Sequence, residues 1–381
     1  VDTNFATNIG TGAGACSGCG AFGIAVQQDG KIVIGGAFTD FNGTAQNMLA
    51  RLNSTGTLDA AFTSSVSNNS GLETVVIQPD GQIIVAGGQT LFNDGTTTRN
   101  NVARLNPATG SIDATFSIGT GVNGGLPSIF LQTNGKILLG GGFTSINNKA
   151  RLSLVRLETN GDLETNFTPV VGTTGTVKAI AVQPDNKIII GGDFYGANDT
   201  LRPRLTRLNP DGTTDLTFNP GAEVVLADSE VTAIAIQTDG KILIGGTFIS
   251  YRGGAAHFGT PRPKYAGSID PTFTATTLGV NAIVVQPDGK IIIGGLFNSV
   301  NGVVNFTRIA RLTTTGTLDA AFTSTGTGSC TCAVEALTLQ TDGKILVGGS
   351  FNQFNGATGI NNIVRLNPAD GSTDAAFTAT A

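Results

Sequence analysis

Four cysteines are the residues of this chain whose type and spacing offer the most distinctive chemistry. Two stand near the start in "CSGC" and two near the end in "CTC". Four cysteines allow three disulfide pairings, and four thiolates also suit a tetrahedral zinc site. We expect disulfides between the two segments, formed in an oxidising compartment, with zinc as the alternative. The cysteines are Cys16, Cys19, Cys330 and Cys332.

Seven arginines recur at a nearly fixed distance before an acidic residue. Each stands eight or nine residues ahead of its acid, a spacing that lets the two charges pair across a hairpin. We interpret them as structural ion pairs, and a ring of anion-binding arginines is the functional alternative. The pairs are Arg51 with Asp59, Arg104 with Asp113, Arg156 with Glu164, Arg207 with Asp215, Arg262 with Asp270, Arg311 with Asp319 and Arg365 with Asp374.

Two further groups of residues are candidates for binding. An acidic cluster could hold a cation or a basic partner, with a solvated loop as the alternative. Aromatic rings beside amide and basic groups suit a glycan, with scattered surface residues as the alternative. The acidic cluster is Glu223, Asp228 and Glu230, and the second group is Tyr195, Asn198, Tyr251, Arg252 and His257.

Signals for catalysis are weak. A Ser-His-acid site would depend on His257, the only histidine, and neither G-x-S-x-G nor H-E-x-x-H occurs. A pair of facing carboxylates could still hydrolyse a glycosidic bond, so that alternative stays open. We therefore expect neither an enzyme nor a cofactor.

The elements that must position these residues repeat along the chain. A landmark Gln-x-Asp-Gly-Lys, followed by an apolar run and two glycines as in "QTDGKILIGG", returns every 49 to 54 residues. A fixed period of this size is typical of solenoids, propellers and arrays. We number the repeats one to seven by their glutamines, which are Gln27, Gln78, Gln132, Gln183, Gln237, Gln286 and Gln340.

Each repeat predicts four short antiparallel strands. The first alternates as in "AIAVQ", the second is apolar throughout as in "KIIIGG", the third resembles "IARLN", and the fourth ends in Asp-x-x-Phe. Asp-Gly between apolar runs favours a tight hairpin, and the paired glycines allow a neighbouring backbone to approach. Seven such units predict an all-β fold, a seven-bladed β-propeller with four antiparallel strands per blade, as a single domain over residues 1–381.

The chain begins and ends with the same part of the repeat, the segment that contains Asp-x-x-Phe. An acid three residues before a phenylalanine occurs eight times, as Asp-x-x-Phe in seven copies and as Glu-x-x-Phe in repeat three, and the extra copy is "VDTNF" at residues 1–5. One terminal copy should complete the last blade; we expect the other to pack on the same molecule, with pairing to a second molecule as the alternative. Cys19 and Cys332 each stand eight residues before a landmark glutamine. We therefore expect the ring to close between the first and last blades.

Composition and loop lengths limit the classes of partner that this chain could bind. A net charge of −5 without a Lys/Arg cluster argues against nucleic acid, and no apolar run is long enough to insert into a membrane. Binding residues usually lie in variable loops, which are longest here before repeats one, five and seven. With the disulfides, this predicts an extracellular or cell-surface location and a protein or glycan partner.

The repeats resemble bacterial delta-60 propeller repeats through Q-x-D-G-K-I-x-I-G-G-x-F and A-R-L-N-x-x-G-x-x-D-x-x-F. The resemblance covers essentially the whole chain and implies large secreted or surface-attached bacterial proteins without an established activity. The paired glycines are also similar to kelch repeats, which include a copper oxidase family. That family's site needs several Tyr and His ligands, and this chain has only three tyrosines and one histidine. Repeat five departs from the pattern with "TPRPKYAG".

These observations predict a non-enzymatic structural or adhesive binding module of a bacterial surface or secreted protein. Three alternatives stay open: a glycan-binding lectin that uses the variable loops, a glycosidase or lyase, and a filament subunit that self-associates through the spare terminal strand.

Overall fold

The computed structural model consists of β-strands and connecting turns, without a helix in the part that it describes. Its residues form two compact units, residues 1–117 with 321–381 and residues 118–320. No described segment is a helix long and apolar enough to span a membrane. The structure describes residues 20–41, 43–63, 66, 71–172, 175–219, 230–247, 270, 272, 273, 275, 277, 279–304, 308–324, 326, 327 and 333–377.

The first unit holds repeats one, two and seven. The strands of repeat one are β1 (Gly20–Val26), β2 (Ile32–Ala37), β3 (Asp40–Phe41), β4 (Thr44–Ala45) and β5 (Leu49–Leu52). Those of repeat two are β6 (Thr74–Ile77), β7 (Ile83–Asn93) and β8 (Thr98–Leu105). Those of repeat seven are β26 (Gly326–Thr327), β27 (Val334–Leu339), β28 (Ile345–Gly349), β29 (Gln353–Phe354), β30 (Ala357–Thr358) and β31 (Ile363–Leu366).

The second unit holds repeats three to six. The strands of repeat three are β9 (Ser128–Leu131), β10 (Ile137–Gly140), β11 (Ser145–Ile146), β12 (Lys149–Ala150) and β13 (Leu154–Leu157). Those of repeat four are β14 (Val177–Val182), β15 (Ile188–Gly192), β16 (Gly196–Ala197), β17 (Thr200–Leu201) and β18 (Leu205–Leu208). Repeats five and six contribute β19 (Val231–Ile236), β20 (Ile242–Gly246), β21 (Val280–Val285), β22 (Ile291–Gly295), β23 (Ser299–Val300), β24 (Val303–Val304) and β25 (Ile309–Leu312).

Repeat four shows how the landmark sequence folds. β14, β15 and β18 form an antiparallel sheet in that order, and every residue of the central strand β15 is buried. A Cβ on Gly191 would lie 2.4 Å from the side chain of Val231 in repeat five, and one on Gly192 would lie 1.9 Å from the Thr176 carbonyl oxygen. The paired glycines are therefore required by close packing within and between repeats.

The predicted fourth strand is reduced to a single bridge residue. In repeat four, Thr214 pairs with Leu208, and the chain then turns at Asp215. The Asp215 carboxylate accepts the Thr217 N–H at 2.9 Å, while the Phe218 N–H donates to the Asp215 carbonyl at 3.2 Å. This turn stops the strand, so each described main sheet has three strands, or two in repeat five.

The connection between the second and third strands, which is outside the four predicted strands, is a small hairpin in repeats one, three, four, six and seven. Its two turn residues have positive φ, for example 51° and 58° at Asn147 and Asn148, and 48° and 60° at Asn198 and Asp199. This is the geometry of a two-residue type I′ turn. In repeat two, β7 and β8 run on through this region as one long hairpin.

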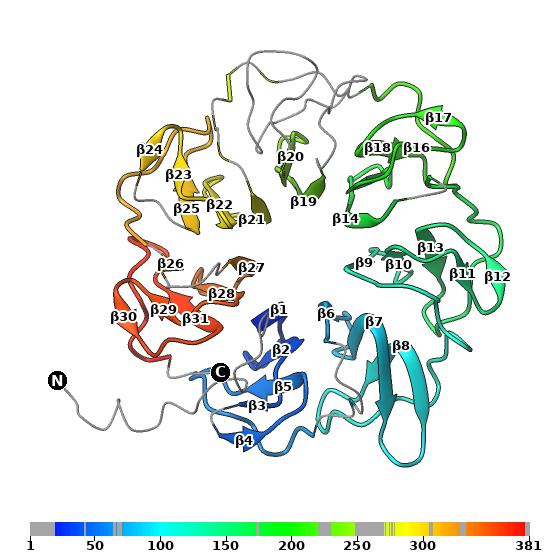
Figure 1. Cartoon of the computed structure of the whole chain (residues 1–381), viewed down its shortest axis with the longest axis horizontal. Helices are drawn as coiled ribbons and strands as arrows, with labels where there is room; N and C mark the ends of the chain where they lie inside the picture. The colour runs from blue at the N-terminus through cyan, green and yellow to red at the C-terminus, as the bar shows by residue number, and fades with distance from the viewer. Residues whose placement is uncertain are drawn as a thin grey trace. The chain divides into compact units, whose positions relative to one another are not determined.

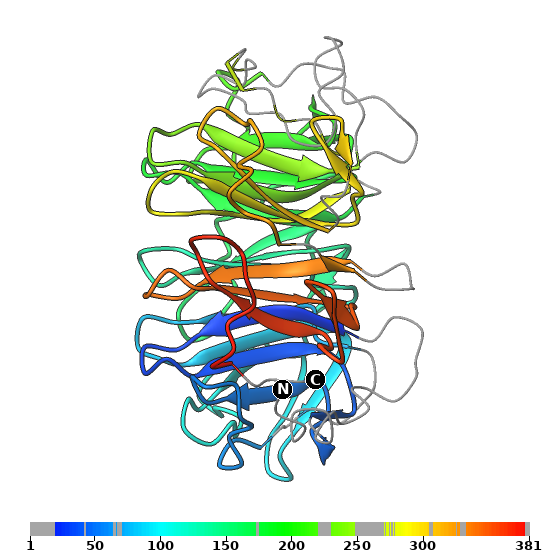
Figure 2. The ribbon, with the colours of Figure 1, turned by 90° about the vertical axis from the view of Figure 1, so that its left-hand side faces the viewer.

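The first and last repeats lie side by side in the first unit, as the sequence predicted. β27 and β28 of repeat seven lie against β1 of repeat one in both views (Figures 1 and 2). A Cβ on Gly348 would lie 2.6 Å from Ile24 Cδ1. The C-terminal Asp-x-x-Phe copy completes repeat seven, since Asp374 pairs with Arg365 of β31. The copy at residues 1–5 lies outside the described residues.

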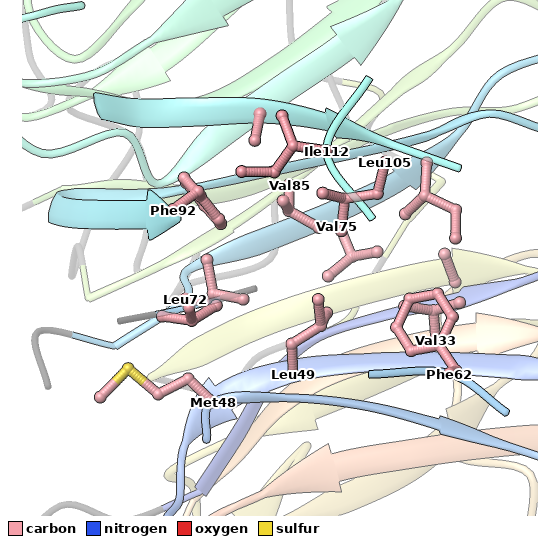
Figure 3. Close-up of a cluster of buried hydrophobic side chains, with 14 residues drawn as sticks. Val33, Met48, Leu49, Phe62, Leu72, Val75, Val85, Phe92, Leu105 and Ile112 are labelled. Carbon is pink, nitrogen blue, oxygen red and sulfur yellow. The ribbon is translucent and has the colours of Figure 1, made fainter. Parts of the chain in front are cut away.

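Packing between neighbouring repeats forms the hydrophobic core. Val33 and Leu49 of repeat one meet Val75 and Val85 of repeat two in a buried cluster (Figure 3). Burying a Val or Leu side chain contributes about 1.5–3 kcal/mol. Each sheet is thus held mainly by the faces that it presents to its neighbours.

Candidate functional site

The described arginines of the Arg–acid pairs lie in buried or largely buried clusters. Arg207 is 0% exposed, and its Nε donates to an Asp215 carboxylate oxygen at 2.8 Å. Its guanidinium also lies over the Phe218 ring, 4.8 Å from the ring centroid. Six such pairs are described, and they are Arg51 with Asp59, Arg104 with Asp113, Arg156 with Glu164, Arg207 with Asp215, Arg311 with Asp319 and Arg365 with Asp374.

Several of these arginines also bind the next repeat. Arg51 donates to the Pro107 carbonyl of repeat two, and Arg156 donates to the Pro210 carbonyl of repeat four. Arg365 makes the equivalent bond from repeat seven to the Ser54 carbonyl of repeat one. Because each of these guanidiniums is committed to an acid and to backbone, the geometry favours the structural interpretation over anion binding. Arg262 lies outside the described residues, whereas its expected partner Asp270 is buried.

A lysine joins most of the acids, and the sequence interpretation missed it. Lys187 Nζ lies 2.9 Å from the Asp215 carboxylate, and Lys31 Nζ lies 2.8 Å from that of Asp59. These lysines are the last residue of Gln-x-Asp-Gly-Lys, so their fixed phase in the repeat was the available signal. In repeat two, where Gln82 replaces the lysine, the Thr115 hydroxyl donates to Asp113 at 2.6 Å. The lysines that reach an acid are Lys31, Lys136, Lys187, Lys241, Lys290 and Lys344.

These contacts make the stability of the fold sensitive to acid. Burial raises the pKa of Asp59, but hydrogen bonds from Lys31 and the Ala61 N–H, together with the charge of Arg51, hold it below its usual 3.8. The pKa is lowered in the same way at Asp113, Glu164, Asp215 and Asp374.

We therefore expect the free energy of unfolding to fall steeply below about pH 4. A carboxyl with a lowered folded-state pKa stabilises the fold above its unfolded pKa and loses that contribution as the pH falls through the folded value. Each such carboxyl adds up to about 1.4 kcal/mol per pH unit in that window. Urea unfolding between pH 2.5 and 7 measures it. A midpoint that holds steady down to pH 2.5, or that already falls above pH 5, would contradict the expectation.

Few of the candidate binding residues lie in the described part of the chain. Glu230 forms an ion pair with Lys178 of β14, which commits it within the fold. Tyr195 and Asn198 lie on the β16–β17 hairpin of repeat four and its approach (Figure 1). The remaining candidates lie outside the described residues, and they are Cys16, Cys19, Glu223, Asp228, Tyr251, Arg252, His257, Cys330 and Cys332.

Asn198 has structural partners. Its carboxamide oxygen accepts the Val170 N–H at 2.8 Å, and its amide donates to the Gly212 carbonyl at 2.8 Å and to the Thr214 hydroxyl at 3.2 Å. Asn355 makes the same two donor bonds in repeat seven. The side chain of Asn198 therefore fixes the hairpin rather than offering groups to a ligand.

A surface hollow of about 320 Å³ lies beside this hairpin. Residues 195–201 line it together with Val170 and Gly172. Two residues with large apolar side-chain surfaces lie on its rim, since Tyr195 and Leu201 line the hollow and are 57% and 66% exposed. Its volume is at the lower end of the range of ligand pockets, about 300–1,000 Å³. The hollow can therefore hold a small ligand or the end of a longer one.

The hairpin of repeat four departs from the other hairpins at the residues around the hollow. In the other four small hairpins the position of Tyr195 is occupied by small polar residues, namely Thr39, Thr144, Asn298 and Asn352. The second turn position is occupied elsewhere by Gly43, Asn148, Gly302 and Gly356.

Asp199 is the clearest of these departures. It holds φ at 60°, where glycine is free of strain and most other residues are not. Every other Asp or Glu in the described ranges has a hydrogen bond or ion pair, whereas Asp199 has none there. The repeat thus places a carboxylate that has no partner among the described residues beside an exposed aromatic ring.

Seven segments of the chain match a family described as "Domain of unknown function (DUF5122) beta-propeller". Each match runs from a landmark glutamine to the phenylalanine of Asp-x-x-Phe, and together the matches cover more than half of the chain. The chain belongs to this family. The matched segments are residues 27–62, 78–116, 132–167, 183–218, 237–273, 286–322 and 340–377.

Solved structures agree with the DUF5122 beta-propeller assignment. The WD40 β-propeller domain of Doa1 superposes with a TM-score of 0.57 at 12% identity, over 89% of this chain and 93% of that one. A putative 6-phosphogluconolactonase from Bacteroides uniformis gives 0.52 at 16% identity, over 90% and 94%. A streptogramin B lyase gives 0.50 at 15% identity, over 87% and 91%. At these identities the likeness shows the fold alone, an all-β propeller of seven repeats.

Two further findings bear on the site. A comparison with curated proteins gives no significant match. Among the described residues, no three His, Cys, Asp or Glu side chains lie together in a way that could hold a metal ion.

Proposed function

We propose that the chain is a non-enzymatic binding module of a bacterial surface or secreted protein, and that the hollow of repeat four is its contact site. The observation that carries the proposal is the contrast between the paired charged groups of the repeats and the exposed residues of one hairpin. The charged groups shared by the repeats are committed to holding neighbouring sheets together, whereas one hairpin exposes Tyr195, Asp199 and Leu201 on a rigid turn. Binding residues typically take such variable positions on a rigid scaffold.

The acids of the Arg–acid pairs are unsuited to act as general acids. A general acid needs a carboxyl whose pKa is raised toward neutrality. The pKa is lowered at Asp59, Asp113, Glu164, Asp215 and Asp374, so these carboxyls stay ionised and paired. The enzymes among the similar structures share only the fold with this chain, and their activities are not carried over.

Adhesion of coated beads tests the proposal. We expect beads that carry the chain to bind fixed bacterial cells or mucin-coated surfaces more than albumin-coated beads do. The double variant Tyr195→Ala/Leu201→Ser should lower the bound fraction several-fold, because both side chains contribute exposed apolar surface at the hollow. Bound beads are counted under flow.

A matched control removes an equally exposed side chain elsewhere. Leu216 is 70% exposed on the Asp-x-x-Phe turn of the same repeat, so Leu216→Ser should leave adhesion unchanged. Adhesion no better than that of albumin, or equal adhesion of the double variant, would contradict the proposal. New reducing ends after incubation with polysaccharides would contradict its non-enzymatic part. Self-assembly through residues 1–5 stays a prediction, to be tested by negative-stain microscopy.

A further inference from the structure

The aromatic ring of Tyr195 is held in place from behind. The Arg204 guanidinium lies 4.7 Å from the ring centroid, and Arg204 is only 5% exposed. The backbone of Arg204 is fixed because its N–H donates to the Phe194 carbonyl at 2.8 Å and its carbonyl accepts the Gly192 N–H at 3.0 Å. More than half of the Tyr195 side chain nevertheless faces solvent. The ring is therefore a preorganised platform whose exposed part is open to stacking.

The carboxylate beside the ring is also preorganised. Asp199 is the second residue of a tight turn, and Asn198 ties that turn to Val170, Gly212 and Thr214. A carboxylate without a partner can accept hydrogen bonds from hydroxyl groups, and such charge-assisted bonds are about twice as strong as neutral ones. The equivalent position is glycine in repeats one, six and seven, so folding does not require an acid here.

The charges near the hollow select among ligand classes. Arg204 lies behind the ring, and Arg202 donates to the Leu201 carbonyl at 3.0 Å, so two guanidiniums accompany one carboxylate. A cationic amine would be attracted by Asp199 but repelled by the Arg204 guanidinium that lies against the Tyr195 ring. An anion would be attracted by the guanidiniums but repelled by Asp199, and it would leave that carboxylate without a hydrogen-bond donor. A neutral ligand with an apolar face and hydroxyl donors meets neither penalty.

We propose that the hollow of repeat four binds a neutral saccharide, with one face of a sugar ring on Tyr195 and its hydroxyls donating to the Asp199 carboxylate. This inference rests on the proposed function as a binding module and names the ligand class of the same site. The C–H groups on a sugar face carry slight positive charge and suit the negative face of an aromatic ring. The apolar rim from Leu201 and Val170 covers the edges of the ring.

A glycan panel tests the inference. The panel carries neutral mono-, di- and oligosaccharides of glucose, galactose, mannose, N-acetylglucosamine and N-acetylgalactosamine, beside uronate oligosaccharides and a trimethyllysine peptide. We expect the intact chain to bind at least one neutral saccharide. Tyr195→Ala should weaken that binding about tenfold or more, and Tyr195→Phe should preserve it because the ring remains.

Variants at the turn separate loss of folding from loss of binding. Asp199→Gly restores the residue found in three other hairpins, so it should keep or raise the thermal unfolding midpoint while it weakens saccharide binding about fivefold to tenfold. Asn298→Ala changes the residue equivalent to Tyr195 in repeat six and should leave binding unchanged.

Each remaining outcome would overturn the saccharide inference. These outcomes are binding to uronates or to the peptide only, binding to none of the panel, and neutral binding that survives Tyr195→Ala and Asp199→Gly. If the coated beads adhere while the panel stays silent, the saccharide class is wrong and the binding function stands. If the beads also fail to adhere, the proposed function itself is wrong.

Discussion

We expect Arg207→Ala to lower the free energy of unfolding by about 3 to 5 kcal/mol. Arg207 is fully buried, and its removal leaves the Asp215 carboxylate, itself 4% exposed, without its closest cation. Breaking a buried pair by removing one partner is costly because an uncompensated charge stays buried. The variant also loses the packing of the guanidinium on Phe218 and its bond to Gln183 Oε1 at 3.1 Å. Urea unfolding at pH 7 measures the change.

Two control variants separate the buried charge from the lost volume. Lys187 contacts the same carboxylate but is 23% exposed in its side chain, so Lys187→Ala should cost about 1 kcal/mol or less. The double variant Arg207→Met/Asp215→Asn removes both charges and keeps most of the volume, so it should recover part of the loss. If Arg207→Ala unfolds within 1 kcal/mol of the unaltered chain, the pair does not stabilise the fold as argued.

The framework of the repeats could be predicted from sequence because it rests on local signals that recur. The Asp-Gly turn, the apolar second strand and the paired glycines each have a direct steric or hydrogen-bonding cause, as Gly191 and Gly192 show. The spacing of Arg207 and Asp215 predicted their contact because a short hairpin leaves few other geometries.

The fourth strand is shorter than the sequence predicted because the Asp215 side chain competes with backbone pairing. The Asp215 carboxylate accepts the N–H of Thr217, two residues later. Aspartate often makes this local hydrogen bond, which favours a turn over a strand. The small hairpins had a readable signal in Asn301-Gly302 and Asn355-Gly356, which are typical of type I′ turns. The prediction of four strands per repeat did not use that signal.

The candidate site could be predicted only in part. Tyr195 was a candidate from its type, and it lies at the hollow. Asn198 was a candidate for the same reason, but it bonds to Val170, 28 residues earlier, a tertiary contact that no local pattern reveals. Asp199 is part of no sequence motif that suggests binding. Its proposed role in binding rests on its positive φ and on the lack of a partner among the described residues.

The neighbouring positions of repeats one and seven bear on the predicted disulfides. A Cβ on Gly20 would lie 2.9 Å from the Gly349 carbonyl oxygen, and a Cβ on Gly349 would lie 2.1 Å from the Ala333 carbonyl oxygen. Gly20 and Ala333 therefore flank the same glycine. Cys19 directly precedes Gly20 and Cys332 directly precedes Ala333, and both cysteines lie outside the described residues. Disulfides between the two cysteine segments therefore stay a prediction with open connectivity, and a bond between Cys19 and Cys332 is the pairing to test first.

We expect reduction of these bonds to lower the stability of the chain more than any single substitution. A bond between residues 19 and 332 closes a loop of about 310 residues, and loop entropy then stabilises the fold by up to about 5 to 6 kcal/mol. Peptide mapping by mass spectrometry without reductant identifies the pairing, and urea unfolding with and without reductant measures the effect. Cys19→Ser, Cys332→Ser and the double variant should cost the same, because either single change already breaks the bond. Four free thiols with bound zinc would replace the disulfides by the metal site, and a Cys16–Cys19 bond would leave the two ends unlinked through sulfur.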